Sequence, residues 1–174
     1  IAAEQPKLRT AEVELRQEPN QAASQKPPAV EEAAFIDSVL SDRSRQLNKQ
    51  RILIVDGEET SLLSAQTYLQ QNGYQQILAT VDVHDALSIV KQREPDVVLL
   101  DLNPPSYSGL EILRGVAADA TTRHLPVIVL ANGLDSKVKQ KALKLGATDF
   151  LNKPIDPFEL IPRVRNALLL KSHR

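Results

Sequence analysis

Two aspartates and one lysine are the residues whose types and spacing could carry chemistry in this chain of 174 residues. Asp56, Asp101 and Lys153 each follow closely on a short apolar run. A carboxylate can attack phosphorus and keep the phosphoryl group as an acyl phosphate. Such a transfer needs a hard cation such as Mg²⁺, which oxygen ligands hold, and a lysine can pair with the transferred group as a point charge. These side chains therefore suit phosphoryl transfer, provided that the fold brings them together.

The elements that must position them are predicted by apolar runs that alternate with amphipathic stretches from residue 51 onward. The expected strands are 52–55, 76–80, 96–100, 126–130 and 149–151, and the expected helices are 60–71, 84–92, 108–118, 136–145 and 157–171. Unbroken apolar strands are typical of parallel sheets covered on both faces, so the alternation predicts a doubly wound α/β fold. Ligands of such sheets bind at the carboxyl ends of the strands, where Asp56, Asp101, Ala131 and Lys153 fall.

Two details of these helices can be tested directly. Gly73 and Gly146 stand where a helix needs a terminating residue with positive φ. In the helix 108–118, the spacing of Leu110, Leu113 and Ala117 predicts that these three side chains form the buried face.

The first fifty residues differ from the rest in composition. Residues 1–30 are rich in Glu, Gln, Ala and Pro and show no sustained period, so they bury too little apolar surface to offset the entropy of ordering. We therefore expect residues 1–50 to be a largely disordered tail or linker. Within it, residues 31–48 could form a short helix with Phe35, Ile36, Val39 and Leu40 on one side. Both a docking or dimerisation helix and a weakly helical linker fit this pattern.

Several blocks from residue 51 to about 170 resemble the receiver domains of two-component response regulators. The segment RILIVDGEE is similar to the family's first strand with its acidic cluster. The segment PDVVLLDLNPPSYSGLEIL resembles the strand and loop around the phosphoacceptor, with Pro105 and Gly109 at matching positions. LPVIVLANG resembles the fourth strand, and KALKLGATDFLNKPIDPFELIPRV resembles the block with the Lys153–Pro154 pair. Several blocks in the right order identify residues 51–174 as a receiver domain.

The resemblance implies a fold and a role for each site residue. The fold would be a five-stranded (βα)5 flavodoxin-like sheet in the order 2-1-3-4-5. Asp101 would accept the phosphoryl group, and Lys153, before a cis peptide bond, would contact its oxygens. Asp56, Asp101 and the backbone carbonyl of Asn103 would hold Mg²⁺. Phe150 would be the aromatic residue that turns inward when the domain is phosphorylated.

Two positions depart from the family pattern. Gly57 stands in place of a second acidic metal ligand, so we expect Mg²⁺ binding to be weak. Glu58, one residue further along, is a candidate for that missing carboxylate. Ala131 replaces the Thr or Ser whose hydroxyl would bond the phosphoryl group. Two functions stay open: a receiver phosphorylated on Asp101 in a phosphorelay, or a degenerate receiver that binds partners as a scaffold without phosphorylation.

The expected partners follow from the same resemblance. They are a histidine kinase or phosphotransfer protein, an output domain or partner on the face formed by 136–145, 149–151 and 157–171, and, as an open alternative, a second copy. Catalysis would be limited to the receiver's own aspartate, so we do not expect an enzyme. The formal net charge of −1 argues against direct nucleic-acid binding, no apolar run is long enough for a membrane helix, and the lack of cysteine fits the cytoplasm. A chain without methionine that ends within a helical pattern is expected to be part of a longer protein.

Overall fold

The computed structural model describes residues 29–102, 108–133 and 135–172. Residues 1–28 of the tail that was expected to be disordered lie outside the described residues, as do Asn103 and Pro105. The chain divides into two units, residues 1–42 and 43–174, and each is described by itself. None of the helices in the described ranges has the length and apolarity needed to cross a bilayer.

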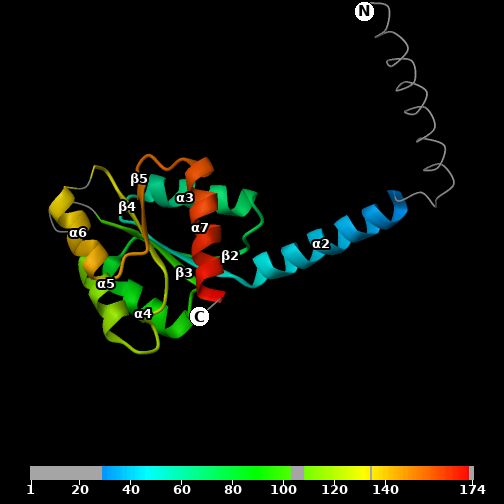
Figure 1. Cartoon of the computed structure of the whole chain (residues 1–174). Coiled ribbons are helices and arrows are strands. Elements are labelled where there is room, and N and C mark those ends of the chain that lie inside the picture. Colours follow the sequence, from blue (N-terminus) through cyan, green and yellow to red (C-terminus); the bar gives the residue numbers. More distant parts are fainter. Residues whose placement is uncertain (1–28, 103–107, 134, 173–174) are drawn as a thin grey trace, which may run out of the picture. The chain divides into compact units, whose positions relative to one another are not determined.

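A five-stranded parallel sheet forms the centre of the unit 43–174, in the strand order β2-β1-β3-β4-β5 (Figure 1). Its strands are β1 Arg51–Val55, β2 Gln76–Thr80, β3 Val97–Asp101, β4 Val127–Ala131 and β5 Asp149–Asn152. The three central strands are almost wholly apolar and buried, because helices cover both faces of the sheet. The predicted doubly wound fold and its strand order are therefore confirmed.

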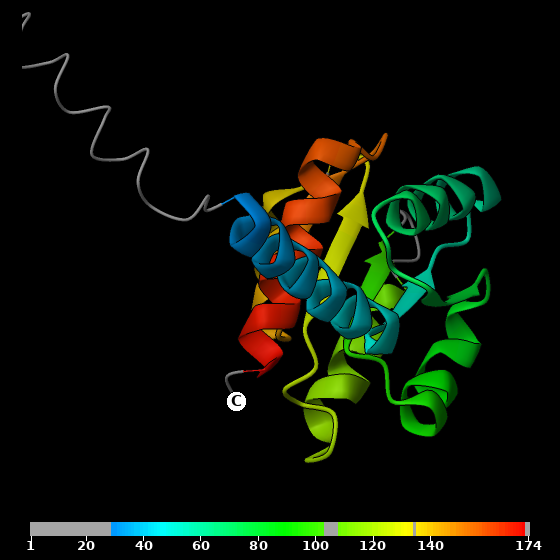
Figure 2. The same cartoon turned by 90° about the vertical axis from the view of Figure 1, so that its right-hand side faces the viewer.

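Helices lie on both faces of this sheet (Figures 1 and 2). The helices are α2 Ala29–Lys49, α3 Glu59–Gln71, α4 Val83–Arg93, α5 Gly109–Ala118, α6 Ser136–Lys144 and α7 Pro157–Ser172. Alternate residues of β1 divide the core in two: Ile52 and Ile54 pack with α3 and α7, whereas Leu53 and Val55 pack with α4 and α5. The sheet is thus held rigidly from both sides, which positions whatever projects from its strand ends.

Helix ends and faces test the finer predictions. Gly73 and Gly146 have φ of 96° and 104°, as expected for residues that terminate helices. The predicted face of α5 is wrong in part, since Ala117 is exposed and Leu110 is only half-buried. The buried residues of α5 are instead Gly109, Ile112, Leu113 and Val116. This face turns toward α4 and the sheet, and contacts that are distant in sequence decide which of several apolar positions is buried.

Helix α2 covers the range in which the sequence left a helix and a linker open. It contains no buried residue along Ala29–Lys49. Near its end, within the unit 43–174, Leu47 packs against the core cluster of β1, α3 and α7. The carbonyl of Asn48 accepts a hydrogen bond of 2.6 Å from the Gln76 side chain at the start of β2. The last turn of α2 is therefore fixed to the sheet.

Candidate functional site

The strand order brings Asp56 and Asp101 to the same rim of the sheet. Strands β1 and β3 are neighbours, with Val55 paired to Leu100, so the two aspartates that come next lie side by side. Lys153 follows β5, which lies beyond β4. Its N–H donates to the carbonyl of Ala131 at 3.0 Å, which fixes its backbone beside the end of β4. From there the lysine side chain reaches the two carboxylates.

The three side chains meet in one buried cluster. The Lys153 Nζ atom lies 2.9 Å from Asp56 Oδ2, 3.0 Å from Asp56 Oδ1 and 2.9 Å from Asp101 Oδ1. The side chains of Asp56, Asp101 and Lys153 are only 0%, 3% and 4% exposed. One ammonium thus compensates two carboxylates that burial would otherwise disfavour as charges. The structure therefore assembles the three residues that the sequence placed at strand ends.

The loop after β1 holds Asp56 and turns Glu58 outward. Asp56 Oδ1 accepts a hydrogen bond of 2.9 Å from the Glu58 N–H, which closes a short turn through Gly57. Glu58 precedes α3, and its side chain is 52% exposed. Its Oε2 lies 3.6 Å from Lys153 Nζ, while its Oε1 accepts from the Thr60 hydroxyl at 3.2 Å. Glu58 is thus a third acid near the lysine, more distant and more solvated than the two aspartates.

Burial and charge shift the titration of the cluster. Burial raises the pKa of Asp101 from 3.8 to about 6; the hydrogen bond from Lys153 opposes this rise and the charge of Asp56 adds to it. Burial alone would lower the pKa of Lys153, but hydrogen bonds and charges from Asp56 and Asp101 outweigh that effect and raise its pKa above 10.5. At neutral pH the cluster therefore presents an ionised Asp101 beside a charged lysine. Such an acid–amine cluster with a raised carboxyl pKa is a functional-site candidate.

Gly109 allows the first turn of α5 to lie close to the backbone of Asp101. A Cβ atom built on Gly109 would meet the Leu102 side chain and would lie 2.8 Å from the Asp101 carbonyl oxygen. No larger residue fits at the start of α5 without moving the backbone that carries Asp101. Steric exclusion of a Cβ atom therefore explains why glycine occupies position 109.

The end of β4 and the middle of β5 carry the residues expected to form the switch. Ala131 is 3% exposed and has no hydroxyl to offer toward the rim. Phe150 is half-buried and packs against the core cluster that α4 and α5 share. The Lys139 ammonium of α6 lies 5.1 Å from the centre of the Phe150 ring, within cation–π range. The sequence analysis missed this contact; the only hint was the run of lysines in α6.

The donor set at the rim offers few ligands to a cation. The described residues contain no group of three or more His, Cys, Asp or Glu side chains that could bind a metal ion. Asn103, whose carbonyl was predicted as a ligand, lies outside the described residues. Asp56 and Asp101 alone fit the one or two carboxylates with which proteins commonly hold Mg²⁺ beside phosphate and water oxygens. The pair is compatible with Mg²⁺, although Gly57 contributes no carboxylate.

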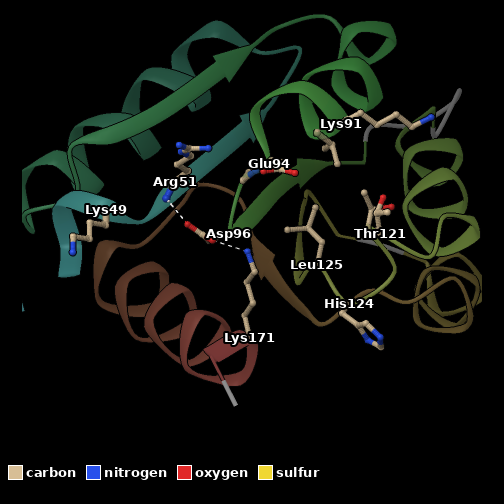
Figure 3. Close-up of a pocket in the computed structure, with 12 residues that line it drawn as sticks. Lys49, Arg51, Lys91, Glu94, Asp96, Thr121, His124, Leu125 and Lys171 are labelled. Atoms are coloured by element: carbon tan, nitrogen blue, oxygen red, sulfur yellow. Dashed lines mark hydrogen bonds and ion pairs between the residues drawn. The ribbon is translucent and has the colours of Figure 1, made fainter. Parts of the chain in front are cut away.

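Two of the pockets lie at opposite ends of the strands. A pocket of about 320 Å³ adjoins the acidic rim, with Glu58, Ser61, Tyr68 and Lys153 in its wall. A larger pocket of about 480 Å³, shown in Figure 3, lies at the amino ends of the strands, whereas the acidic cluster lies at their carboxyl ends. There Asp96 accepts from the Arg51 N–H at 2.8 Å and pairs with the Lys171 ammonium at 2.5 Å. These contacts tie α7 to β1 and β3, so we interpret the larger pocket as structural.

Comparison with known proteins decides the family. The model of the response regulator receiver domain matches residues 52–165. The chain belongs to this family. The cis peptide bond between Lys153 and Pro154, implied by the family resemblance, is present in the receiver domain.

Individual relatives agree with this assignment. Response regulator PleD of Caulobacter vibrioides is 37% identical over 122 residues, which cover 70% of this chain and 26% of PleD. Protein PilH of Pseudomonas aeruginosa is 34% identical over 119 residues, covering 68% of this chain and 97% of PilH. The crystal structure of a response regulator from Desulfuromonas acetoxidans superposes with a TM-score of 0.61 at 26% identity, over 70% of this chain and 98% of that one. The receiver thus spans about a quarter of PleD but nearly all of PilH.

Proposed function

We propose that this receiver accepts a phosphoryl group on Asp101 and passes its phosphorylation state to a partner or output domain. The observation that supports this function is the buried cluster in which Lys153 Nζ lies 2.9 Å from both Asp56 and Asp101. A structural ion pair needs only one carboxylate, whereas a phosphoryl site needs a nucleophile, a cation-binding acid and an amine. The cluster supplies all three in a largely solvent-excluded position.

The proposed reaction is a displacement at phosphorus. A carboxylate oxygen of Asp101 forms a bond to phosphorus while the bond to the donor's leaving group breaks, and that group departs with the bonding electron pair. The donor is a histidine kinase, a phosphotransfer protein or a small acyl phosphate. The Lys153 ammonium then releases Asp101 and pairs with a phosphoryl oxygen while it keeps its contact with Asp56. Because the nucleophile is the ionised form, the rate should rise as pH passes through about 6, the raised pKa of Asp101.

Mg²⁺ would be held by Asp56 and Asp101, with the Asn103 carbonyl as a further predicted ligand. When bound, it would neutralise charge on the phosphate oxygens. Glu58 is a weaker candidate ligand, since its carboxylate is 52% exposed and already accepts from Thr60. We expect the affinity for Mg²⁺ to be low for a receiver, because Gly57 leaves the loop one carboxylate short.

The test is adduct formation on the full chain. Acetyl phosphate with Mg²⁺ should yield an acyl-phosphate adduct, detected by intact-protein mass spectrometry and mapped to Asp101. The Asp101→Asn variant should give none, whereas Asp96→Asn, which changes an aspartate at the amino end of the same strand, should react like the wild type. No Mg²⁺-dependent adduct and no beryllofluoride binding by the wild type would contradict the proposed function.

A second function, partner binding without phosphorylation, is favoured by Gly57 and Ala131 together. Ala131 is buried at the end of β4, and its carbonyl already bonds Lys153, so the only group it presents to the rim is a methyl. A receiver without that hydroxyl has lost one means of coupling the phosphoryl group to Phe150. Binding of a partner that is equal for wild type, Asp101→Ala and Asp101→Glu would support this scaffold function, and clear differences would exclude it.

A further inference from the structure

The exposed face of α2 carries an apolar stripe at its centre. The stripe consists of Phe35, Ile36, Val39 and Leu40, which are 47–70% exposed. Their spacing of one, three and one residues places them on one side of the helix, as adjoining turns of an amphipathic face. A contiguous stripe of large apolar side chains on a helix that buries no residue is typical of an interaction surface.

Charged residues at the two ends of the α2 stripe have opposite sign. Glu32 lies three residues before the stripe and Arg43 three residues after it. At helical spacing both fall on the line of the stripe, not beside it. The first turn of α2 also carries Glu31, and its last turn carries Lys49. The line through the stripe therefore begins with the acidic Glu32, is apolar in the middle and ends with the basic Arg43.

Arg43 belongs to the unit 43–174 and also lines a pocket of that unit. The pocket has a volume of about 230 Å³, and its wall includes Arg43, Leu47, Tyr74, Arg165 and Leu169. Burial raises the pKa of Tyr74, and the charges of Arg165 and Arg43, which line the same pocket, oppose that rise. Two cations beside an apolar hollow suit an acidic, amphipathic helix end.

We propose that two copies of this chain associate through α2 in antiparallel orientation. The stripe of each copy packs on the stripe of the other, and Glu32 of each copy faces Arg43 of the other. Glu32 and Arg43 are equally far from the centre of the stripe, so antiparallel pairing sets them against each other at both ends. Parallel pairing in register would instead set Glu32 on Glu32 and Arg43 on Arg43, which the like charges oppose.

Glu32 is too far from Arg43 of the same helix to form an ion pair with it. Eleven residues separate Glu32 from Arg43, which corresponds to about 16 Å along a continuous α-helix. Glu32 and Arg43 of one copy therefore cannot form an ion pair with each other within α2. In the proposed dimer, a second copy of the chain supplies an arginine for Glu32 together with a matching apolar stripe.

Sedimentation equilibrium of the full chain tests this association. The wild type should dimerise reversibly, and both Glu32→Arg and Arg43→Glu should weaken the dimer about tenfold or more, because each change reverses two symmetry-related charge pairs. An equimolar mixture of the two variants restores both pairs and should recover the wild-type affinity as a heterodimer. Ser41→Arg is the control, since it also introduces an arginine, but on the opposite side of α2, and it should have little effect.

Orientation is tested separately by cross-linking. The chain contains no cysteine, so Glu32→Cys and Arg43→Cys each introduce the only thiol of the molecule. Under mild oxidation a mixture of the two variants should form a disulfide-linked dimer, and either variant alone should form far less. Circular dichroism of each variant checks that α2 stays helical.

Three outcomes would overturn the proposal. If the wild type is monomeric at every concentration, the stripe does not bind a second copy of the chain. If neither charge reversal changes the affinity of the dimer, its interface lies outside α2. Efficient cross-linking of Glu32→Cys with itself would show a parallel pair. None of these results bears on Asp101 phosphorylation, so the two proposals fail independently.

Discussion

At the scale of single residues, the site depends on how one ammonium holds two buried carboxylates. Asp101 lies in a largely solvent-excluded position, and its charged form is disfavoured by burial and by Asp56. Lys153 compensates only in part, because it divides its charge between the two acids. Removing the charge of Asp101 should therefore stabilise the folded state.

Asp101→Asn should stabilise the receiver at neutral pH. The folded pKa of Asp101 is about 6 against an ordinary 3.8, so the folded state binds a proton more tightly than the unfolded state. The free energy of unfolding of the wild type should then fall as pH rises from about 4 to 6 and stay lower above that. At pH 7 the variant should be more stable by about 1 to 3 kcal/mol, and the difference should vanish near pH 4. Urea denaturation at several pH values measures this.

The matched control for this prediction is Asp119→Asn. Hydrogen bonds from the Thr121 N–H and hydroxyl lower the pKa of Asp119, so its charge stabilises the fold above its ordinary pKa and that effect is lost in acid. Its replacement should not stabilise the protein at pH 7. Equal stability of wild type and Asp101→Asn at pH 7 would show that the acidic cluster is not strained.

Gly57→Asp should raise the affinity for Mg²⁺. The nearest atom to a Cβ at this position is the Val81 carbonyl oxygen at 3.8 Å, so the loop has room for a side chain. A third carboxylate beside Asp56 and Asp101 should strengthen binding by about tenfold, equivalent to about 1.4 kcal/mol. Isothermal titration calorimetry is suitable, because the chain has no tryptophan to report on the site by fluorescence. Gly57→Asn, of equal size without the charge, should bind Mg²⁺ like the wild type, and an equal gain from both changes would count against a carboxylate effect.

At the scale of elements, the approach of α5 to the end of β3 controls where Asp101 sits. Gly109→Ala should destabilise the receiver by roughly 1 to 3 kcal/mol, because its Cβ would meet the Leu102 side chain and the Asp101 carbonyl at 2.8 Å. Thermal unfolding measures the loss, and adduct formation on Asp101 should slow as its backbone moves. Gly57→Ala, where the nearest atom is 3.8 Å away, is the steric control. A stable, fully reactive Gly109→Ala variant would refute this role.

Some elements of the fold could be predicted from the sequence, and others could not. Strands were predictable because short unbroken apolar runs such as residues 97–100 are typical of a sheet covered on both faces. The buried face of α5 was not, since Leu110, Val116 and Ala117 are all apolar and only contacts with α4 and β3 select among them. Likewise, strand ends placed Asp56 and Asp101 on one rim, but the reach of Lys153 across β4 depends on a side-chain conformation. Residue spacing carries no information on that conformation.

At the scale of the whole molecule, function is distributed over separate parts of the chain. The acidic cluster projects from the carboxyl ends of the strands, whereas the Asp96–Lys171 pair joins elements at their amino ends. The apolar stripe belongs to α2, which buries no residue of its own. The Asp96–Lys171 pair shares no residue with the cluster of Asp56, Asp101 and Lys153, and neither does the α2 stripe. The chemistry of Asp101 and the self-association of the chain should therefore be separable by truncation.

A chain reduced to residues 43–174 should still be phosphorylated on Asp101 but should no longer dimerise. The buried core of the receiver lies between Ile52 and Leu168, and Leu47, which packs against it, is retained. We therefore expect a melting temperature close to that of the full chain and the same rate of adduct formation on Asp101. Dimerisation should disappear, since Glu32 and the stripe are gone, and this is measured by sedimentation in parallel with calorimetry. A fall of more than about 4 °C in melting temperature, equivalent to about 1 kcal/mol or more, would instead mean that residues 1–42 stabilise the receiver directly.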